Sequence, residues 1–269
     1  MQDGDKLFSG SIAALYDRHL GPLLFQPYAD DLARRLGDLA GGDLLEIAAG
    51  TGIVTAALCA ALPPAVALTA TDLNPAMLEA AAQKPGLARA RFRQADAQAL
   101  PFADTSFDAV VCQFGVMFFP DKAGAYGEMR RVLRPGGRLL FNVWDKIAAN
   151  PLSQAVTDTV AALFPADPPR FLARTPHGYC DIGAIRAALA AAGFRDIAAE
   201  TVALTGGAPD ARAAAVGLCQ GTPLRNEIEA RAADRLGAVT DEVAAMLRAR
   251  YGAGAIADRI QAIVFSARA

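Results

Sequence analysis

Three acidic residues end or interrupt apolar segments in the first hundred positions. Glu46 lies within LLEIAAGTG, Asp72 ends AVALTATD, and Asp96 ends ARFRQAD. Gly50 and Gly52 carry no Cβ and can adopt positive φ, so the backbone after Glu46 can approach a ligand closely. An acid about 20 residues after such a loop, as Asp72 is, accepts hydrogen bonds from a ribose diol in nucleotide-binding folds.

The elements that must position these acids alternate in type along the chain. We expect strands at 43–49, 65–72, 90–96, 107–115 and 138–144, with helices that run to about residue 62, from 75 to 83 and from 122 to 133. Such alternation implies parallel strands joined by right-handed crossovers, so the sequence predicts an α/β fold with a doubly wound sheet. The acids then stand at the carboxyl ends of strands, where open α/β sheets bind ligands.

The flanking segments are predominantly helical. Residues 11–40 show helical spacing, with breaks expected at Gly21-Pro22 and Gln26-Pro27, and RPGG (134–137) is expected to form a turn. The second half predicts a helix and a Pro-rich loop over 150–179, a helix over 181–194 capped by Asp181, a strand over 195–204, helices over 208–253 and a strand over 258–269.

Composition narrows the class of protein. The chain has 269 residues, 53% of them hydrophobic, and a formal net charge of −2, so no field attracts nucleic acid. The four cysteines form no C-x-x-C pair, which argues against a zinc site and a disulfide framework and for a reducing compartment. With no signal peptide and no apolar run of membrane-spanning length expected, we predict a cytoplasmic protein without stable membrane association or a bound metal.

Four segments together resemble the class I S-adenosylmethionine-dependent methyltransferases, in the group similar to the ubiquinone- and menaquinone-biosynthesis enzymes (methyltransferase type 11). They are LLEIAAGTG, LTATDLNPAML, FRQADAQALPFADTSFDAVVCQFGVMFF and EMRRVLRPGGRLLFNVW, and they cover about residues 40–145. The resemblance implies a Rossmann-like fold with a mostly parallel seven-stranded sheet, and S-adenosylmethionine as cofactor. It also implies a helical cover over 1–40 and a cofactor-binding domain over 41–269 with helical insertions at about 146–180 and 208–253.

The resemblance also implies roles for individual residues. Glu46 would orient the glycine loop or the methionine ammonium, and Asp72 would hold the ribose hydroxyls. Asp96 would accept from the adenine amino group. The remaining cofactor contacts would come from the backbone of Ala48, Gly50 and Gly52, from Leu73 and Met77 against the adenine, from the Ala97 N–H, and from Gln113 near the methyl group. The family often has glycine or cysteine where Ala48 and Ala49 stand, and alanine also fits there.

Each acid also has a purely structural alternative. Glu46 can pair at the sheet edge, Asp72 can cap the helix that starts near Pro75, and Asp96 can shape the turn that follows it. A nicotinamide dinucleotide is an alternative cofactor, but the third glycine of its fingerprint would fall on Thr55, which is too large for the usual helix–strand contact. Asp108 is interpreted as structural.

The chemistry expected from the resemblance is in-line methyl transfer, in which the protein aligns the acceptor and excludes water. His19 and His177 are weak candidates for a base, with surface or capping roles as the alternative. Tyr16, Phe25, Tyr28 and Phe118 are candidates for the wall of an acceptor pocket, as is Phe119, with core packing as the alternative for the last two. The long cover segments suit a small or medium-sized, fairly apolar acceptor. A non-catalytic S-adenosylmethionine-binding protein and a nicotinamide-dependent oxidoreductase remain alternatives, and the oligomeric state is open.

Overall fold

The computed structural model describes residues 14–269. Its seven strands form one sheet in the order β3-β2-β1-β4-β5-β7-β6. The strands are β1 (Gly42–Ile47), β2 (Val66–Asp72), β3 (Arg91–Gln94), β4 (Phe107–Gln113), β5 (Leu133–Trp144), β6 (Arg195–Ala208) and β7 (Ile256–Arg268). Strands β1 to β5 pair in parallel. The predicted doubly wound, mostly parallel sheet of seven strands is therefore confirmed.

The last strand, β7, runs antiparallel to its neighbour β5. The Gly136 N–H donates to the Ala269 carbonyl at 3.0 Å, and the Ala269 N–H donates to the Gly137 carbonyl at 2.9 Å. This reciprocal pair at the start of β5 and the end of β7 is the pattern of antiparallel neighbours. The expected turn at RPGG is wrong, because residues 134–137 are instead drawn into β5, with Gly136 at φ +77° and a register shift opposite Phe107 and Ala109.

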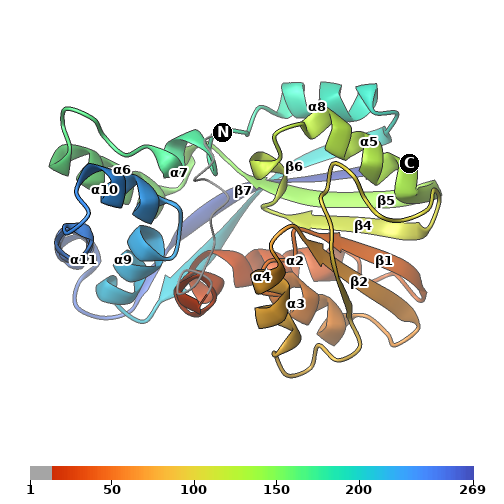
Figure 1. Cartoon of the computed structure of the whole chain (residues 1–269), viewed down its shortest axis with the longest axis horizontal. Coiled ribbons are helices and arrows are strands. Elements are labelled where there is room, and N and C mark those ends of the chain that lie inside the picture. Colours follow the sequence, from red (N-terminus) through yellow and green to blue (C-terminus); the bar gives the residue numbers. More distant parts are fainter. Residues whose placement is uncertain (1–13) are drawn as a thin grey trace. The chain divides into compact units, whose positions relative to one another are not determined.

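The chain divides into two compact units, which we describe separately. One unit comprises residues 28–143, 180–202 and 262–269 and holds most of the sheet. Within it, the helices α2 (Gln26–Arg35), α3 (Ile53–Ala61) and α4 (Pro75–Ala82) lie on one face of the sheet, and α5 (Lys122–Val132) and α8 (Ile182–Ala191) lie on the other (Figure 1). The first face is a continuous apolar layer that includes Leu32, Leu44, Leu58, Leu68 and Val111. This burial holds the parallel strands in one register, since a slip of one residue would move every side chain of a strand to the opposite face of the sheet.

The opposite face is built from larger aromatic side chains. The Phe141 ring stacks on Phe265 with centroids 5.0 Å apart and lies 5.8 Å from the Tyr126 ring of α5. Asp181 caps α8 as expected, with its carboxylate accepting the Ala184 N–H at 2.9 Å. The ring contacts hold β5 against β7 and against α5.

The other unit comprises residues 14–27, 144–179 and 203–261 of the described chain and is largely helical. It holds a π-helix (η2, Tyr16–Phe25), α6 (Pro151–Leu163), α7 (Phe171–Arg174), α9 (Ala211–Gln220), α10 (Leu224–Arg231), α11 (Leu236–Tyr251) and the 3₁₀ turn η4 (Ile147–Ala149). A second 3₁₀ turn, η3 (Val116–Phe118), belongs to the sheet unit. Helix α9 approaches the π-helix closely at Gly217, where a Cβ would lie 2.9 Å from Leu20 Cδ2. The division into a helical cover and a cofactor-binding domain stays a prediction.

The expected breaks near the N-terminus are wrong. The helix continues from residue 14 to Arg35, through both Pro22 and Pro27. A proline ring clashes with the carbonyl four residues earlier in an α-helix. The π pattern bonds over five residues instead of four, which makes room for Pro22 without ending the helix.

Candidate functional site

The loop after β1 is held in a conformation that only a few residue types adopt readily. Ala48, Gly50 and Gly52 have φ of +56°, +55° and +81°. At Gly52 a Cβ would lie 3.0 Å from Ala81 Cβ, so this glycine allows α3 to start close against α4. At Gly50 a Cβ would meet nothing within 4 Å. The backbone at Gly50 therefore borders open space in which a ligand can lie.

Glu46 is buried directly beneath this loop. Its side chain is 2% exposed, and its Oε2 accepts the Thr55 hydroxyl at 2.7 Å. Burial raises the pKa of Glu46 to about 8, the nearby Asp72 carboxyl adds to the rise, and the Thr55 hydrogen bond opposes it. The folded chain therefore favours the protonated form of this carboxyl group at neutral pH.

Asp72 joins the loop after β1 to the end of β2. One carboxylate oxygen accepts the Gly50 N–H at 2.8 Å, and the other accepts the Asn74 N–H at 2.8 Å. Burial raises the pKa of Asp72, and the backbone donors oppose this rise. The alternative that Asp72 caps the next helix is wrong, because Asn74 caps α4 by accepting the Ala76 N–H. A carboxylate has about four acceptor positions, so Asp72 retains room for hydroxyl donors.

Apolar side chains border this end of the sheet. Leu73 is 50% exposed, and no other large hydrophobic side chain among residues 14–269 is classed as exposed. Met77 and Ala97 lie buried on the following elements. An exposed leucine beside a carboxylate suits a nucleoside. Its base can lie on the apolar side chain while the hydroxyls of its sugar face the acid.

Asp96 shapes the loop that follows β3 in this structure. Its Oδ1 accepts the Gln98 N–H at 2.9 Å, and the Gln98 side chain in turn accepts the Asp121 N–H at 2.8 Å. The structure therefore displays the turn-forming alternative. The role of Asp96 toward adenine stays a prediction.

The loop after β4 packs directly onto the loop after β1. Gln113 is the half-buried last residue of β4, and Phe114 follows with φ +50°. At Gly115 a Cβ would lie 2.6 Å from Ala48 Cβ and 2.7 Å from Cys112 Sγ, so only glycine fits there. The structure thus brings Glu46, Ala48, Gly50, Asp72 and Gln113 to one edge of the sheet.

The candidate pocket residues divide between the two units. Within the sheet unit, Tyr28 is fully buried, its hydroxyl donates to the Val202 carbonyl at 2.8 Å, and its ring lies edge-on to Phe114 at 5.3 Å. Phe118 is half-buried after β4. In the helical unit the Tyr16 and Phe25 rings stack with centroids 4.7 Å apart. Their part in an acceptor pocket stays a prediction.

The two histidines lie in different settings within the helical unit. His177 is buried, its Nδ1 lies 2.7 Å from the Asp145 carbonyl oxygen, and its ring is 5.9 Å from the Trp144 ring. Burial lowers the pKa of His177 to about 4. His19 is half-buried on the π-helix, and burial lowers its pKa as well. His177 is the more rigidly held of the two.

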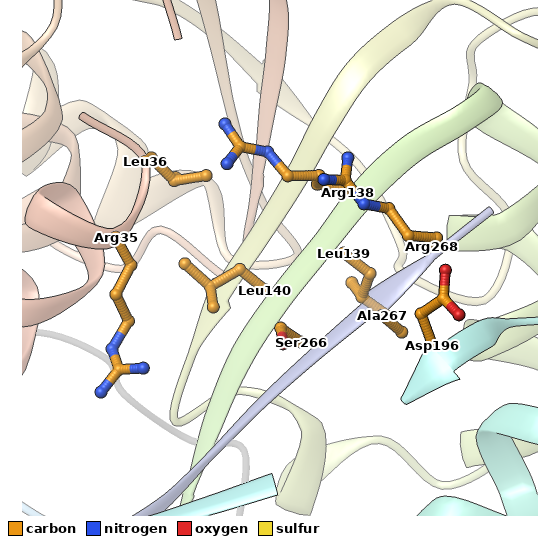
Figure 2. Close-up of a pocket in the computed structure, with 9 residues that line it drawn as sticks. All are labelled: Arg35, Leu36, Arg138, Leu139, Leu140, Asp196, Ser266, Ala267 and Arg268. Atoms are coloured by element: carbon orange, nitrogen blue, oxygen red, sulfur yellow. The ribbon is translucent and has the colours of Figure 1, made fainter. Parts of the chain in front are cut away.

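A separate cavity lies at the amino ends of the central parallel strands, opposite their carboxyl ends (Figure 2). It has a volume of about 340 Å³, and its charged lining residues are Arg35, Arg138, Arg268 and Asp196. Arg138 already pairs with Asp38 at 2.7 Å, and Arg35 pairs with Glu200 at 2.8 Å. Because Arg138 stands beside the first residues of β4, this cavity is remote from the carboxyl edge that carries Glu46 and Asp72. We assign it no ligand.

The residues of the carboxyl edge fit an adenosyl sulfonium cofactor. Gly50 leaves open space beside the loop, Asp72 offers acceptors for ribose hydroxyls, and the exposed Leu73 offers an apolar surface for a base. Glu46 supplies a buried carboxyl for a cationic amino acid moiety. Within residues 14–269 no three His, Cys, Asp or Glu side chains gather as a metal site would require.

Several residues of the site were missed by the sequence reasoning. Thr55 and Thr71 donate to the Glu46 side chain and backbone, Asn74 caps α4, and Asn142 accepts the Phe114 N–H. The Asn-Pro pair at 74–75 is a visible helix-start signal that could have been used. The others lie inside apolar strands or helices, where the sequence gives no sign of a partner.

Comparison with known proteins places this geometry in context. Residues 45–141 match the family model of the methyltransferase domain. The chain is 34% identical to the ubiquinone/menaquinone biosynthesis C-methyltransferase UbiE of Ectopseudomonas mendocina over 58% of this chain and 66% of that protein. It is 32% identical to UbiE of Escherichia coli over 58% of this chain and 68% of that protein. The chain thus spans about two thirds of the length of these relatives.

The fold is shared with solved structures at lower identity. The Haemonchus contortus phosphoethanolamine N-methyltransferase 2, in complex with S-adenosyl-L-methionine, superimposes with a TM-score of 0.59 at 17% identity. The similarity covers 98% of this chain and 58% of that one. At this identity the likeness concerns the fold.

The raised pKa of Glu46 predicts a specific dependence of stability on pH. Between pH 4.5, its ordinary pKa, and about 8, the unfolded chain releases this proton while the folded chain retains it, so the free energy of unfolding falls as pH rises. The fall is at most roughly 1.4 kcal/mol per pH unit. Urea unfolding at pH 5, 7 and 8.5 measures it, and Glu46→Gln, which stays neutral, should remove this part of the slope. Parallel curves for the two proteins would contradict the assignment.

Proposed function

Because this chain belongs to the class I S-adenosylmethionine-dependent methyltransferases, in the group of the ubiquinone/menaquinone biosynthesis C-methyltransferases, we propose that it transfers a methyl group to a small or medium-sized, fairly apolar organic acceptor. The carrying observation is the hydrogen bond from the Gly50 N–H to the Asp72 carboxylate at 2.8 Å. It joins the glycine loop to an acid with spare acceptor positions, beside an exposed leucine.

Each residue of the carboxyl edge takes a distinct part in binding the cofactor. Asp72 accepts from the ribose hydroxyls, and Leu73 and Met77 contact the adenine. Asp96 accepts from the adenine amino group, with the Ala97 N–H donating to the ring. The backbone of Ala48, Gly50 and Gly52 lies against the methionine moiety, whose ammonium faces Glu46, and Gln113 lies near the methyl group.

The buried carboxyl group of Glu46 and the half-buried one of Asp72, at one edge of the sheet, favour a cation. Glu46 and Asp72 both lie in low-dielectric surroundings that penalise their ionised forms, and a neighbouring positive charge relieves this penalty. The pyrophosphate of a nicotinamide dinucleotide would bring negative charge to the same loop. Thr55 also fills the position that the dinucleotide fingerprint reserves for glycine and uses its hydroxyl to bind Glu46. These observations disfavour the oxidoreductase alternative.

When bound, the cofactor supplies an activated methyl group on a sulfonium. The protein then has to place the acceptor atom in line with the bond that breaks and to keep water away. Tyr28 and Phe118 of the sheet unit are proposed to line that space. An apolar lining of this kind suits an apolar acceptor. In a separate respect, none of the helices in the described range 14–269 is long and apolar enough to cross a membrane.

His19 and His177 stay candidates for a general base, where the acceptor needs one. The Nδ1 of His177 lies 2.7 Å from the Asp145 carbonyl oxygen, so the proton sits on Nδ1 and Nε2 is the acceptor nitrogen. Burial lowers the pKa of His177, which keeps the ring neutral throughout the physiological range.

The proposed function is tested by a panel of ligands. S-adenosylmethionine and S-adenosylhomocysteine should each raise the melting temperature and bind in calorimetry, whereas NAD and NADP should not, because only a ligand of the folded state stabilises it. Stabilisation by a nicotinamide cofactor alone would refute the proposal.

In the Asp96→Ala protein, the preference for the adenosyl compound over its inosine analogue should disappear. Binding without methyl transfer to any of a broad set of acceptors would favour the non-catalytic alternative.

Replacement of Asp72 should weaken cofactor binding selectively. Asp72→Ala removes the acceptor for the ribose and for the Gly50 N–H, and we expect Kd for S-adenosylhomocysteine to rise at least roughly tenfold, or about 1.5 kcal/mol. Calorimetry on the folded variant measures this change. Asp104→Ala is the matched control, since Asp104 is an exposed acid of the same unit that pairs with Arg131. An unchanged Kd for Asp72→Ala would remove Asp72 from the site.

The burial of His177 predicts a ring that stays neutral over a wide pH range. Nitrogen NMR of the wild-type ring should show the neutral Nδ1–H form from pH 5 to 8, because burial lowers its pKa to about 4 and the Asp145 carbonyl accepts from Nδ1. A ring that becomes protonated near pH 6.5 would argue against this prediction.

A further inference from the structure

Phe114 occupies a backbone conformation that needs external support. Its φ of +50° lies in the left-handed region, which bulky residues rarely adopt. The residue directly follows β4, between Gln113 and Gly115. Support for this conformation therefore decides where both neighbours lie.

The support comes from Asn142 on the adjacent strand β5. The Phe114 N–H donates to Asn142 Oδ1 at 2.9 Å and to the Asn142 backbone carbonyl at 3.2 Å. Asn142 is 0% exposed and stands beside Gln113 in the register of β4 and β5. The Asn142 side chain thus gives the Phe114 N–H a second acceptor, beside the Asn142 backbone carbonyl, just after the end of β4.

This hydrogen bond reaches the glycine loop through one residue. Gly115, next to Phe114, packs so tightly on Ala48 that a Cβ would lie 2.6 Å from Ala48 Cβ. Ala48 itself has a left-handed φ of +56°. A change in the Phe114 backbone would therefore move Gly115 and release the loop that the cofactor contacts.

The second polar atom of Asn142 argues that the residue is not simple core filling. Since Oδ1 accepts a backbone N–H, the other terminal atom is the Nδ2 donor, and no residue in the described range 14–269 accepts from it. A buried donor without a partner costs free energy, and an apolar side chain of similar size would avoid this cost. The Phe114 contact is what an apolar side chain cannot supply.

We propose that Asn142 is a positioning residue for the cofactor site, acting through Phe114 and Gly115 on the glycine loop. The inference rests on the proposed function, because its readout is the binding of an adenosyl cofactor. It assigns a role at the end of β5, outside the motifs from which the sequence reasoning drew the cofactor contacts.

The test compares two variants of one position. Asn142→Leu has similar volume but no acceptor for the Phe114 N–H, and Kd for S-adenosylhomocysteine should rise about tenfold or more. Asn142→Asp keeps the acceptor oxygen, and its burial favours the neutral carboxyl group. Kd for this variant should therefore lie within about threefold of the wild-type value. Thr240→Val, which removes one buried hydroxyl from α11, is the control and should leave Kd unchanged.

The outcomes separate the two proposals. Wild-type protein that binds neither adenosyl compound would refute the proposed function itself. Wild-type binding with equal Kd for Asn142→Leu would refute the positioning role alone, as would a failure of Asn142→Asp to restore binding. If Asn142→Leu does not fold, hydrogen exchange of the wild-type Phe114 amide decides. This amide should exchange more slowly when S-adenosylhomocysteine is added, and an unchanged rate would overturn the role of Asn142.

Discussion

The candidate site depends on the bond between the Gly50 N–H and the Asp72 carboxylate. It ties the loop after β1 to the end of β2, so two segments 22 residues apart become one surface. The bond also occupies only part of the acceptor capacity of Asp72, which leaves the acid able to receive further donors. Together with the Ala49 N–H, which donates to the Thr71 carbonyl at 2.9 Å, it anchors the left-handed residues of the loop on the neighbouring strand.

Backbone conformations that are costly elsewhere gather at this edge of the sheet. Ala48 and Phe114 are non-glycine residues with positive φ, and they lie in the two loops that meet at Gly115. Such conformations persist only where the surrounding contacts determine them, and they cluster at binding sites. Here the supporting contacts are the Asn142 side chain for one loop and the Asp72 carboxylate for the other.

Electrostatics give the site its preference for a ligand charge. Glu46 and Asp72 are both drawn toward their neutral forms by burial, and their proximity raises the pKa of Glu46 further. A cationic ligand reverses that balance, whereas an anionic one increases the repulsion. In the arginine-lined cavity at the other end of the strands, Arg35 and Arg138 are already paired with Glu200 and Asp38. The carboxyl edge and this cavity therefore differ in chemistry as well as in place.

The sequence by itself determined the order of strands and helices and the acids that end the strands, because periodicity, caps and glycine loops are local signals. It failed at Pro22, which a π-helix accommodates without ending, and at RPGG, which is drawn into β5 by pairing with the distant end of β7. Only the tertiary structure decided that Thr55 serves Glu46, that Asn74 replaces Asp72 as a cap, and that Asn142 holds Phe114. These roles follow from packing between strands and helices far apart in the chain, which no local pattern records.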